Sequence, residues 1–229
     1  MSLDLERYRL ACSKYDEEWK ATDEVLYALC QRYPDHQDRG GINAKLWIIG
    51  RAYATGIERK ITSKGTQGSS MEQLSVHLRM KAKDIDAILE GVRGVREPLT
   101  PDKLTKILDA HGRLVSIVQD ALRNGQTPRS FVSKYLHFHN PVVPIFDSVA
   151  IRAARKHYRR ERDGAAFEIP ATADEQYADF LLRFWLLYQE ARAAGVRVSV
   201  KLLDNYLLAL AKEAKLNASR EHDDCPHTH

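Results

Sequence analysis

Apolar residues recur at helical spacing along almost the whole chain, and this pattern limits the possible folds more than any other feature of the sequence. For example, Ile42, Leu46, Ile49, Tyr53 and Ile57 lie three or four positions apart, which places them on one face of a helix. The alternation of apolar and polar residues that is typical of a strand is almost absent. The sequence therefore predicts an all-α, mainly helical fold.

Interruptions in this spacing divide the chain into separate helices. The proline in Thr100-Pro101-Asp102 marks a helix start, and Asn124-Gly125 marks a stop. The segment FLLRFWLLY is apolar on almost every side, which predicts a helix deep in the core. Helices are expected at residues 4–33 (one helix or two), 42–60, 71–80, 85–92, 101–123, 128–139, 148–156, 174–194 and 199–215, with a surface loop at 62–70.

The length of 229 residues suits one large domain or two closely packed helical lobes. We expect residues 1–215 to form a single helical domain of two lobes, followed by a polar, flexible tail at residues 216–229. The tail contains histidines, aspartates and a cysteine. Donors crowded on a chain end more often bind metal adventitiously than hold a cofactor, so we assign no metal site and no cofactor.

Composition favours a cytoplasmic protein. No stretch approaches the roughly 20 apolar residues of a membrane span, and the sequence MSLDLERYRL lacks the apolar core of a signal peptide. Cys12, Cys30 and Cys225 are odd in number and irregularly spaced, which is typical of a reduced compartment rather than a disulfide framework. A net charge of +4 permits a nucleic-acid partner without requiring one.

The most informative stretch is residues 113–157. Two helices joined by the short turn NGQTP form a helical hairpin, and NPVVPIFD then leads to a further helix. Such a turn, with the helix start that follows it, offers backbone N–H groups to a phosphate. Polar and basic side chains close by are expected to contact DNA phosphates; they are Arg129, Ser130, Lys134, Ser148 and Arg152.

Asp147 stands at the start of the helix after VVPI, and two interpretations are compatible there. The first is a helix N-cap, which accepts hydrogen bonds from the next turn at about 1 kcal/mol. The second is catalysis, because a capping aspartate is held rigid and charged. Those properties suit a carboxylate that stabilises an oxocarbenium-like sugar, or activates water against it, as in sugar hydrolases.

A helical hairpin followed by a Pro-hydrophobic-Asp step resembles the helix–hairpin–helix DNA glycosylase superfamily. More narrowly, SFVSKYLHFHNPVVPIFDSVA is similar to a bacterial branch with an 8-oxoguanine DNA glycosylase-like fold, as are WKATDEVLYALC, KLWIIGRAYATGIERKI and KLLDNYLL. The resemblance implies a central cleft between the lobes, Asp147 as the catalytic carboxylate and a monomer. It also implies excision of a flipped base from double-stranded DNA. The base is an oxidised purine or, in antiphage defence, a hypermodified cytosine.

The chain departs from that superfamily in two places. The hairpin reads NGQTP instead of hydrophobic-Pro-Gly-hydrophobic-Gly, and the position of the lysine of bifunctional members falls near Arg129 or Ser130. Lys134 lies roughly one turn further on. We therefore expect a monofunctional enzyme that uses water, in which Lys134 orients Asp147 or holds a phosphate. A non-catalytic DNA-binding or interaction module is the alternative, and a two-metal nuclease is disfavoured because acidic residues are not clustered.

Other candidates have structural alternatives. Tyr53, Tyr135, Trp185 and Tyr188 are expected to line a base pocket, since aromatic rings stack on flipped bases, or else to pack in the core. The basic residues Arg51 and Arg59 match the family pattern and either approach DNA or form a solvated face. Two further polar residues, Asp204 and Asn205, fall within a leucine-rich helix and need partners there, so they support the site or join two helices.

Overall fold

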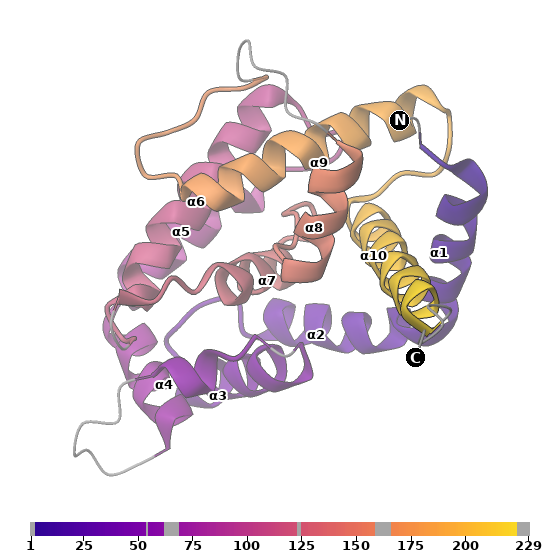
Figure 1. Cartoon of the computed structure of the whole chain (residues 1–229). Helices are drawn as coiled ribbons and strands as arrows, with labels where there is room; N and C mark the ends of the chain where they lie inside the picture. Colours follow the sequence, from indigo (N-terminus) through magenta and orange to yellow (C-terminus); the bar gives the residue numbers. More distant parts are fainter. Residues whose placement is uncertain (1–2, 54, 62–68, 123–124, 159–165, 224–229) are drawn as a thin grey trace.

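The computed structural model describes residues 3–53, 55–61, 69–122, 125–158 and 166–223, with side chains up to residue 214 (Figure 1). About 73% of the chain is helical, which confirms the all-α prediction. Within the described ranges the β-structure is a single isolated bridge between Ile61 and Leu122. The helices are α1 Leu5–Glu18, α2 Lys20–Arg32, α3 Arg39–Trp47, the π-helical η1 Ile48–Ala52, the 3-10 helix η2 Ile57–Lys60, α4 Ser70–Met80, α5 Ala82–Arg93, α6 Pro101–Gln119, α7 Arg129–His139, α8 Ser148–His157, α9 Glu175–Ala193 and α10 Val200–Asp223.

Two segments differ from the sequence prediction. The single helix expected at residues 42–60 is divided into α3, η1 and η2. The backbone stays helical from α3 into η1, whereas Gly56, with a left-handed backbone of φ 66°, interrupts the helix before η2. The last helix runs to Asp223, so residues 216–223 are helical rather than part of a tail. Their sequence contains Leu, Ala, Arg and Glu but no glycine or proline, and such residues favour helix even when they are polar. The remainder of the expected tail, residues 224–229, lies outside the described residues.

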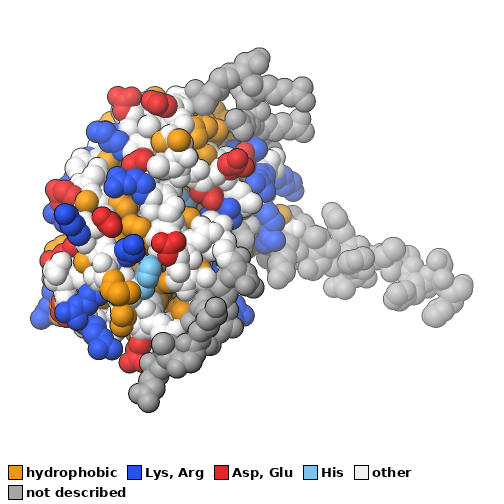
Figure 2. All heavy atoms as spheres, turned by 90° about the vertical axis from the view of Figure 1, so that its left-hand side faces the viewer, with side chains coloured by type: hydrophobic (Ala, Val, Ile, Leu, Met, Phe, Trp, Pro, Cys, Tyr) orange, Lys and Arg blue, Asp and Glu red, His pale blue; other side chains and the backbone are white. Residues whose placement is uncertain are grey.

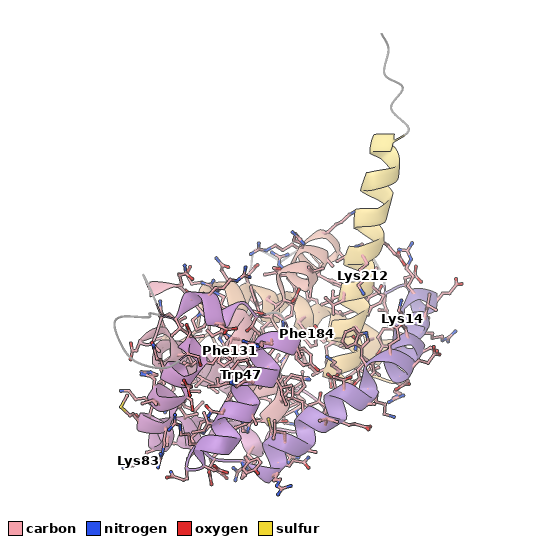
Figure 3. The ribbon with its side chains drawn as sticks, turned by 90° about the horizontal axis from the view of Figure 1, so that it is seen from below. Lys14, Trp47, Lys83, Phe131, Phe184 and Lys212 are labelled. Carbon is pink, nitrogen blue, oxygen red and sulfur yellow. The ribbon has the colours of Figure 1, made fainter. Side chains whose placement is uncertain are left out.

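The helix α7 occupies the centre of the fold. It packs against α2, α5, α6 and η1, and all its residues from Phe131 to Phe138 are buried. The helix α9 is buried as the FLLRFWLLY segment predicted, with Phe184 fully inaccessible. In Figure 3, Phe131 and Phe184 lie inside the body of the molecule, whereas Lys14 and Lys83 lie at its edges. The core therefore forms around α7 and α9.

The helix α10 stands between α1 and α8 (Figure 1) and packs against both. Its final turns project beyond the rest of the molecule (Figure 3). Because α8 also packs against α9, the start of α8 is positioned by the core on one side and by α10 on the other. This arrangement fixes the site described next.

The surface is of mixed charge where it can be seen in Figure 2. Lysines and arginines alternate with acidic side chains on the side of α4, α5 and α6, so this face does not form the basic patch that nucleic-acid binding needs. None of the described helices has the length and apolar character needed to cross a membrane.

Candidate active site

The connection between α7 and α8 is buried and held by its backbone. Residues 142–146 are all buried, so their polar backbone groups need partners inside the protein. Three side chains provide them. The bonds run from Nδ1 of His137 to the carbonyl of Val143 (2.8 Å), from the amide of Phe146 to Oγ of Ser133 (2.9 Å), and from the hydroxyl of Tyr177 to the carbonyl of Pro144 (2.8 Å). The VVPIF step is thus a rigid support for Asp147.

The protonation state and the hydrogen bonds of His137 are both fixed by its surroundings. Burial lowers the pKa of its imidazole to about 3, and the nearby Lys201 charge acts in the same direction. A neutral ring has one donor and one acceptor nitrogen. Since Nδ1 donates to Val143, Nε2 accepts from the Tyr27 hydroxyl at 2.7 Å. The ring is therefore a structural link between the connection after α7 and Tyr27 on α2.

Asp147 and Lys134, the two predicted catalytic residues, lie together. Oδ1 of Asp147 accepts a hydrogen bond from the Val149 amide at 2.8 Å and caps α8, while Oδ2 lies 3.4 Å from Nζ of Lys134. The same ammonium donates to the carbonyl of Tyr53 at 2.9 Å. Each carboxylate oxygen thus has its own partner, and both partners interact best with the charged form of the acid.

The pair lies at the boundary between core and solvent. The Lys134 side chain is 6% exposed, and that of Asp147 is 28% exposed. The next residue, Ser148, and Arg152 one turn further along α8 are both exposed. The carboxylate is therefore accessible from outside while its lysine partner is held from inside.

A second charged group, formed by Asp23, Lys201 and Asp204, lies behind this pair. Nζ of Lys201 is 3.2 Å from Oδ2 of Asp23 on α2 and 3.7 Å from Oδ2 of Asp204 on α10. Both aspartates are buried. Tyr53 connects the two groups, since its hydroxyl donates to Oδ1 of Asp23 and its carbonyl accepts from Lys134. We call these six residues the inner network: Asp23, Tyr53, Lys134, Asp147, Lys201 and Asp204.

Asp204 is the least satisfied member of the inner network. Its Oδ1 is buried and has no hydrogen-bond partner among the described residues. Burial raises the pKa of the Asp204 carboxyl to about 6, even though the charges of Lys201 and Lys134 oppose that shift. The negative charges of Asp147 and Asp23 raise it further. Sequence reasoning identified Asp204 as a polar residue in need of partners but missed Asp23 and Lys201.

Three of the four expected base-pocket residues are core residues instead. Tyr135 is 1% exposed, and its hydroxyl hydrogen-bonds with Nε2 of His36 at 2.6 Å. Tyr188 is equally buried, accepts from the Leu99 amide at 3.0 Å and stacks on the buried Trp185. These rings contact protein rather than an open site, because their helices α7 and α9 form the core. The fourth residue, Tyr53, is half-buried beside Lys134.

The arginines expected to contact DNA fall into two groups, those that are paired within the protein and those that are exposed without an ion pair in the described part of the chain. Arg129 forms an ion pair with Asp174, the N-cap of α9, which neutralises the charge predicted to bind phosphate. Arg51 lies over the Trp47 ring at 3.7 Å and pairs with Glu58 at 3.1 Å. Arg59 and Arg152 are exposed and have no ion pair within the described ranges, and Ser130 is partly buried in the first turn of α7. Of the arginines expected to contact DNA, Arg59 and Arg152 therefore remain available for a phosphate.

The hairpin turn is only partly described. Gly125 adopts a left-handed backbone with φ 61°, as a tight turn requires, whereas Asn124 lies outside the described residues. Pro128 stands at the N-cap of α7 and makes no side-chain hydrogen bond there. Phosphate binding at this turn stays a prediction.

Comparison with protein-family models, with curated proteins and with solved structures finds no match to this chain. The resemblance to helix–hairpin–helix DNA glycosylases therefore stays a prediction. Its support comes from the quoted sequence segments and from the position of Asp147 beside Lys134 at the start of α8.

Proposed function

We propose that this chain is a monofunctional DNA glycosylase that removes a modified or damaged base from double-stranded DNA and leaves an abasic site. The observation that supports it best is the pairing of Asp147 with Lys134 at the boundary between core and solvent, 3.4 Å apart. A rigid, half-exposed carboxylate at a helix start is what hydrolysis of an N-glycosidic bond needs.

In the proposed reaction, Asp147 faces the anomeric carbon of an extruded nucleotide. As the bond to the base breaks, positive charge develops on the sugar, and a fixed negative charge stabilises that state more than the ground state. The bonding electron pair leaves with the base nitrogen, which takes a proton from solvent. Water then adds to the anomeric carbon and loses a proton. This chemistry requires no metal or organic cofactor.

Lys134 serves to orient Asp147 rather than to attack the sugar. A lysine nucleophile must be a neutral amine with a free lone pair. Here Nζ lies against two acceptors, Oδ2 of Asp147 and the carbonyl of Tyr53, and both bind the protonated form. The arrangement thus supports hydrolysis over Schiff-base chemistry.

DNA would approach from the exposed side of Asp147. Arg152 on α8, one turn beyond Asp147, supplies positive charge there, and the exposed Arg59 in η2 is a second candidate phosphate contact. The affinity that such residues confer falls as salt concentration rises. Extruding the base costs a few kcal/mol, and the half-buried Tyr53, whose carbonyl contacts Lys134, is the aromatic residue that we propose contacts it. An oxidised purine and a hypermodified cytosine of phage DNA are the two substrate classes, in a cytoplasmic enzyme.

The decisive experiment compares base release by Asp147→Asn and the unchanged protein. Duplex oligonucleotides with different modified bases are incubated without metal and then heated in alkali, which cleaves abasic sites. Asparagine caps helices about as well as aspartate, so folding is preserved while base release falls by at least about a hundredfold. Asp38→Asn, at the N-cap of α3, is the matched control and keeps full activity. Equal base release by both variants refutes the proposal.

A non-catalytic DNA-binding module is the second candidate. It is favoured by the ion pair between Arg129 and Asp174, because this contact removes a charge that a catalytic hairpin would place on phosphate. Binding of duplex DNA without base release from any substrate would support the module. Strand cleavage without alkali would instead indicate lyase activity and make Lys134 a nucleophile.

A further inference from the structure

The inner network contains more acid than base. It has three carboxylates, on Asp23, Asp147 and Asp204, and two ammonium groups, on Lys134 and Lys201. Lys201 forms ion pairs with two of the acids, whereas Lys134 forms an ion pair with Asp147. With every group charged, the network carries one net negative charge. That sign is complementary to the positive charge that develops on the sugar in the proposed reaction.

Several polar atoms of the network lack a hydrogen-bond partner of their own among the described residues, and they include Oδ2 of Asp23, which only forms an ion pair with Lys201, and Oδ1 of Asp204. An ammonium group has three N–H donors, and two acceptors are assigned to Lys134, the Tyr53 carbonyl and Oδ2 of Asp147. Asp204 has a buried Oδ1 with no hydrogen-bond partner among the described residues. The charges of Lys134 and Asp147 both act on the Asp204 carboxyl. A spare donor and an orphaned acceptor thus share one low-dielectric region.

These observations connect Asp204 to the strength of Asp147. While Asp204 is negative, it attracts part of the Lys134 charge, so Asp147 keeps more of its own negative potential toward the sugar. Once Asp204 is neutral, Lys134 and Asp147 balance each other and the network has no net charge. Interactions between charges are strong in a buried region, so the difference is felt at the anomeric carbon.

We propose that Asp204 is a positioning residue of the active site, whose carboxylate, paired with Lys201, counterbalances Lys134 and so preserves the negative potential of Asp147. This inference rests on the proposed glycosylase function. It requires no contact between Asp204 and the substrate, because Asp204 acts through Lys134.

The proposal makes base release depend on pH. The charged groups that act on Asp204 are Lys201 on its own helix, Asp23 on α2, Lys134 on α7 and Asp147 at the start of α8, with the Tyr27 hydroxyl as a further titratable neighbour. Its carboxyl has a pKa raised to about 6 by burial. Above that pH the network is negative, and below it Asp204 binds a proton and the network becomes neutral. Base release therefore slows as pH falls through about 6.

The test compares Asp204→Asn, an isosteric change, with the unchanged protein in single-turnover base release between pH 5 and pH 8. Above pH 7 the variant is expected to be roughly tenfold slower, since one buried unit charge near the site is removed, with the same affinity for DNA. The decrease in rate of the unchanged protein near pH 6 is absent in the variant. Asp16→Asn, an exposed carboxylate on α1 that pairs with Arg197, is the control and leaves rate and pH profile unchanged. An Asp204→Asn profile identical to that of the unchanged protein overturns the proposal.

A second measurement needs no enzymatic activity. The pKa of Asp204 is followed by carboxyl-carbon NMR in the full chain and in Lys134→Met. Because the positive charge of Lys134 lowers the pKa of Asp204, its removal is expected to raise that pKa further. An unchanged pKa shows that the two residues are not coupled and overturns the proposal. If the pKa moves but no substrate loses a base, the glycosylase function fails while the coupling of Asp204 to Lys134 stands.

Discussion

Two neighbouring residues of α7, Lys134 and Tyr135, point into two different buried polar clusters, and the contrast between these clusters separates structural from functional chemistry. On one side is the inner network. On the other is what we call the lock, formed by His36, Lys45, Asp86 and Tyr135 with His139 beside them. Both are built from charged and aromatic side chains that are largely buried.

The lock is satisfied at almost every atom. Nδ1 of His36 bonds to Asp86 at 2.7 Å and Nε2 bonds to the Tyr135 hydroxyl at 2.6 Å. Burial lowers the pKa of His36 to about 4, so the ring is neutral and uses one nitrogen as donor and one as acceptor. Nζ of Lys45 donates to the carbonyls of Tyr33 and Asp35. Such a cluster joins α2, α3, α5 and α7 without leaving a group free to react.

The inner network is different in this respect. Asp204 keeps an oxygen without a hydrogen-bond partner among the described residues, and Asp147 is partly open to solvent. Unsatisfied buried groups cost stability, so they persist where another requirement outweighs that cost. The comparison therefore supports the proposal that the inner network, not the lock, is the reactive side of α7.

The largest expected effects come from one substitution in each cluster, Lys134→Gln in the inner network and Lys45→Gln in the lock. Lys134→Gln removes the charge that orients Asp147, and base release is expected to fall roughly a hundredfold, the effect of a small misplacement of a catalytic group. The free energy of unfolding is expected to fall by only about 1 kcal/mol, because Asp147 is exposed enough to stay hydrated and a single carbonyl, that of Tyr53, loses its charged donor. Single-turnover assays and urea unfolding measure the two quantities.

Lys45→Gln is the matched change in the lock and is expected to behave in the opposite way. Lys45 is fully buried, and its loss leaves the carbonyls of Tyr33 and Asp35 without their charged donor, at a cost of about 3 kcal/mol in the free energy of unfolding. Base release per folded molecule stays unchanged. If Lys45→Gln loses activity without losing stability, the division into a structural and a reactive cluster is wrong.

A somewhat smaller effect concerns the stability of the inner network itself. The pKa of Asp204 is raised from 3.8 to about 6 in the folded protein, so between these values the folded state binds a proton that the unfolded state has lost. Stability therefore falls as pH rises through this window, and the decrease is complete above about pH 6. In urea unfolding, Asp204→Asn is expected to remove this decrease, which amounts to about 2–3 kcal/mol. Parallel pH profiles of the two proteins would contradict it.

The sequence predicted the half of the site that lies on one local motif. Helical periodicity predicted the all-α class. The sequence that leads from the helix carrying Lys134 through VVPI to the next helix start predicted that Asp147 and Lys134 belong to one site. Both sit within thirteen residues of each other, so their proximity follows from local geometry.

The other half depends on tertiary packing. Asp23 comes from α2 and Lys201 from α10, and only the packing of distant helices brings them to Tyr53 and Asp204. A weak signal was present, because Asp23 lies on the same helical face as the buried Leu26 and Cys30. For the tyrosines the sequence left two interpretations open, a base pocket or the core, for the same reason. An aromatic residue in a helix has the same pattern whether it lines a pocket or fills the core, and for Tyr135 and Tyr188 the packing of α7 and α9 decided for the core.

The smallest expected effect extends the comparison to the surface. Arg152 is exposed on α8, one turn beyond Asp147, whereas Arg79 is exposed on α4, on the side of the lock, and neither has an ion pair within the described ranges. If DNA binds over the inner network, Arg152 neutralises a phosphate and Arg79 does not. Arg152→Gln should then reduce the slope of log affinity against log salt by about 1, while Arg79→Gln leaves the slope unchanged. Fluorescence anisotropy with a labelled duplex across a salt series measures both.

Equal slopes for the two variants would place the DNA elsewhere, and a reduced slope for Arg79→Gln alone would place it over the lock. The effect is small because one arginine contributes one phosphate contact. It nevertheless shows where on the surface the DNA binds, which the activity assays do not.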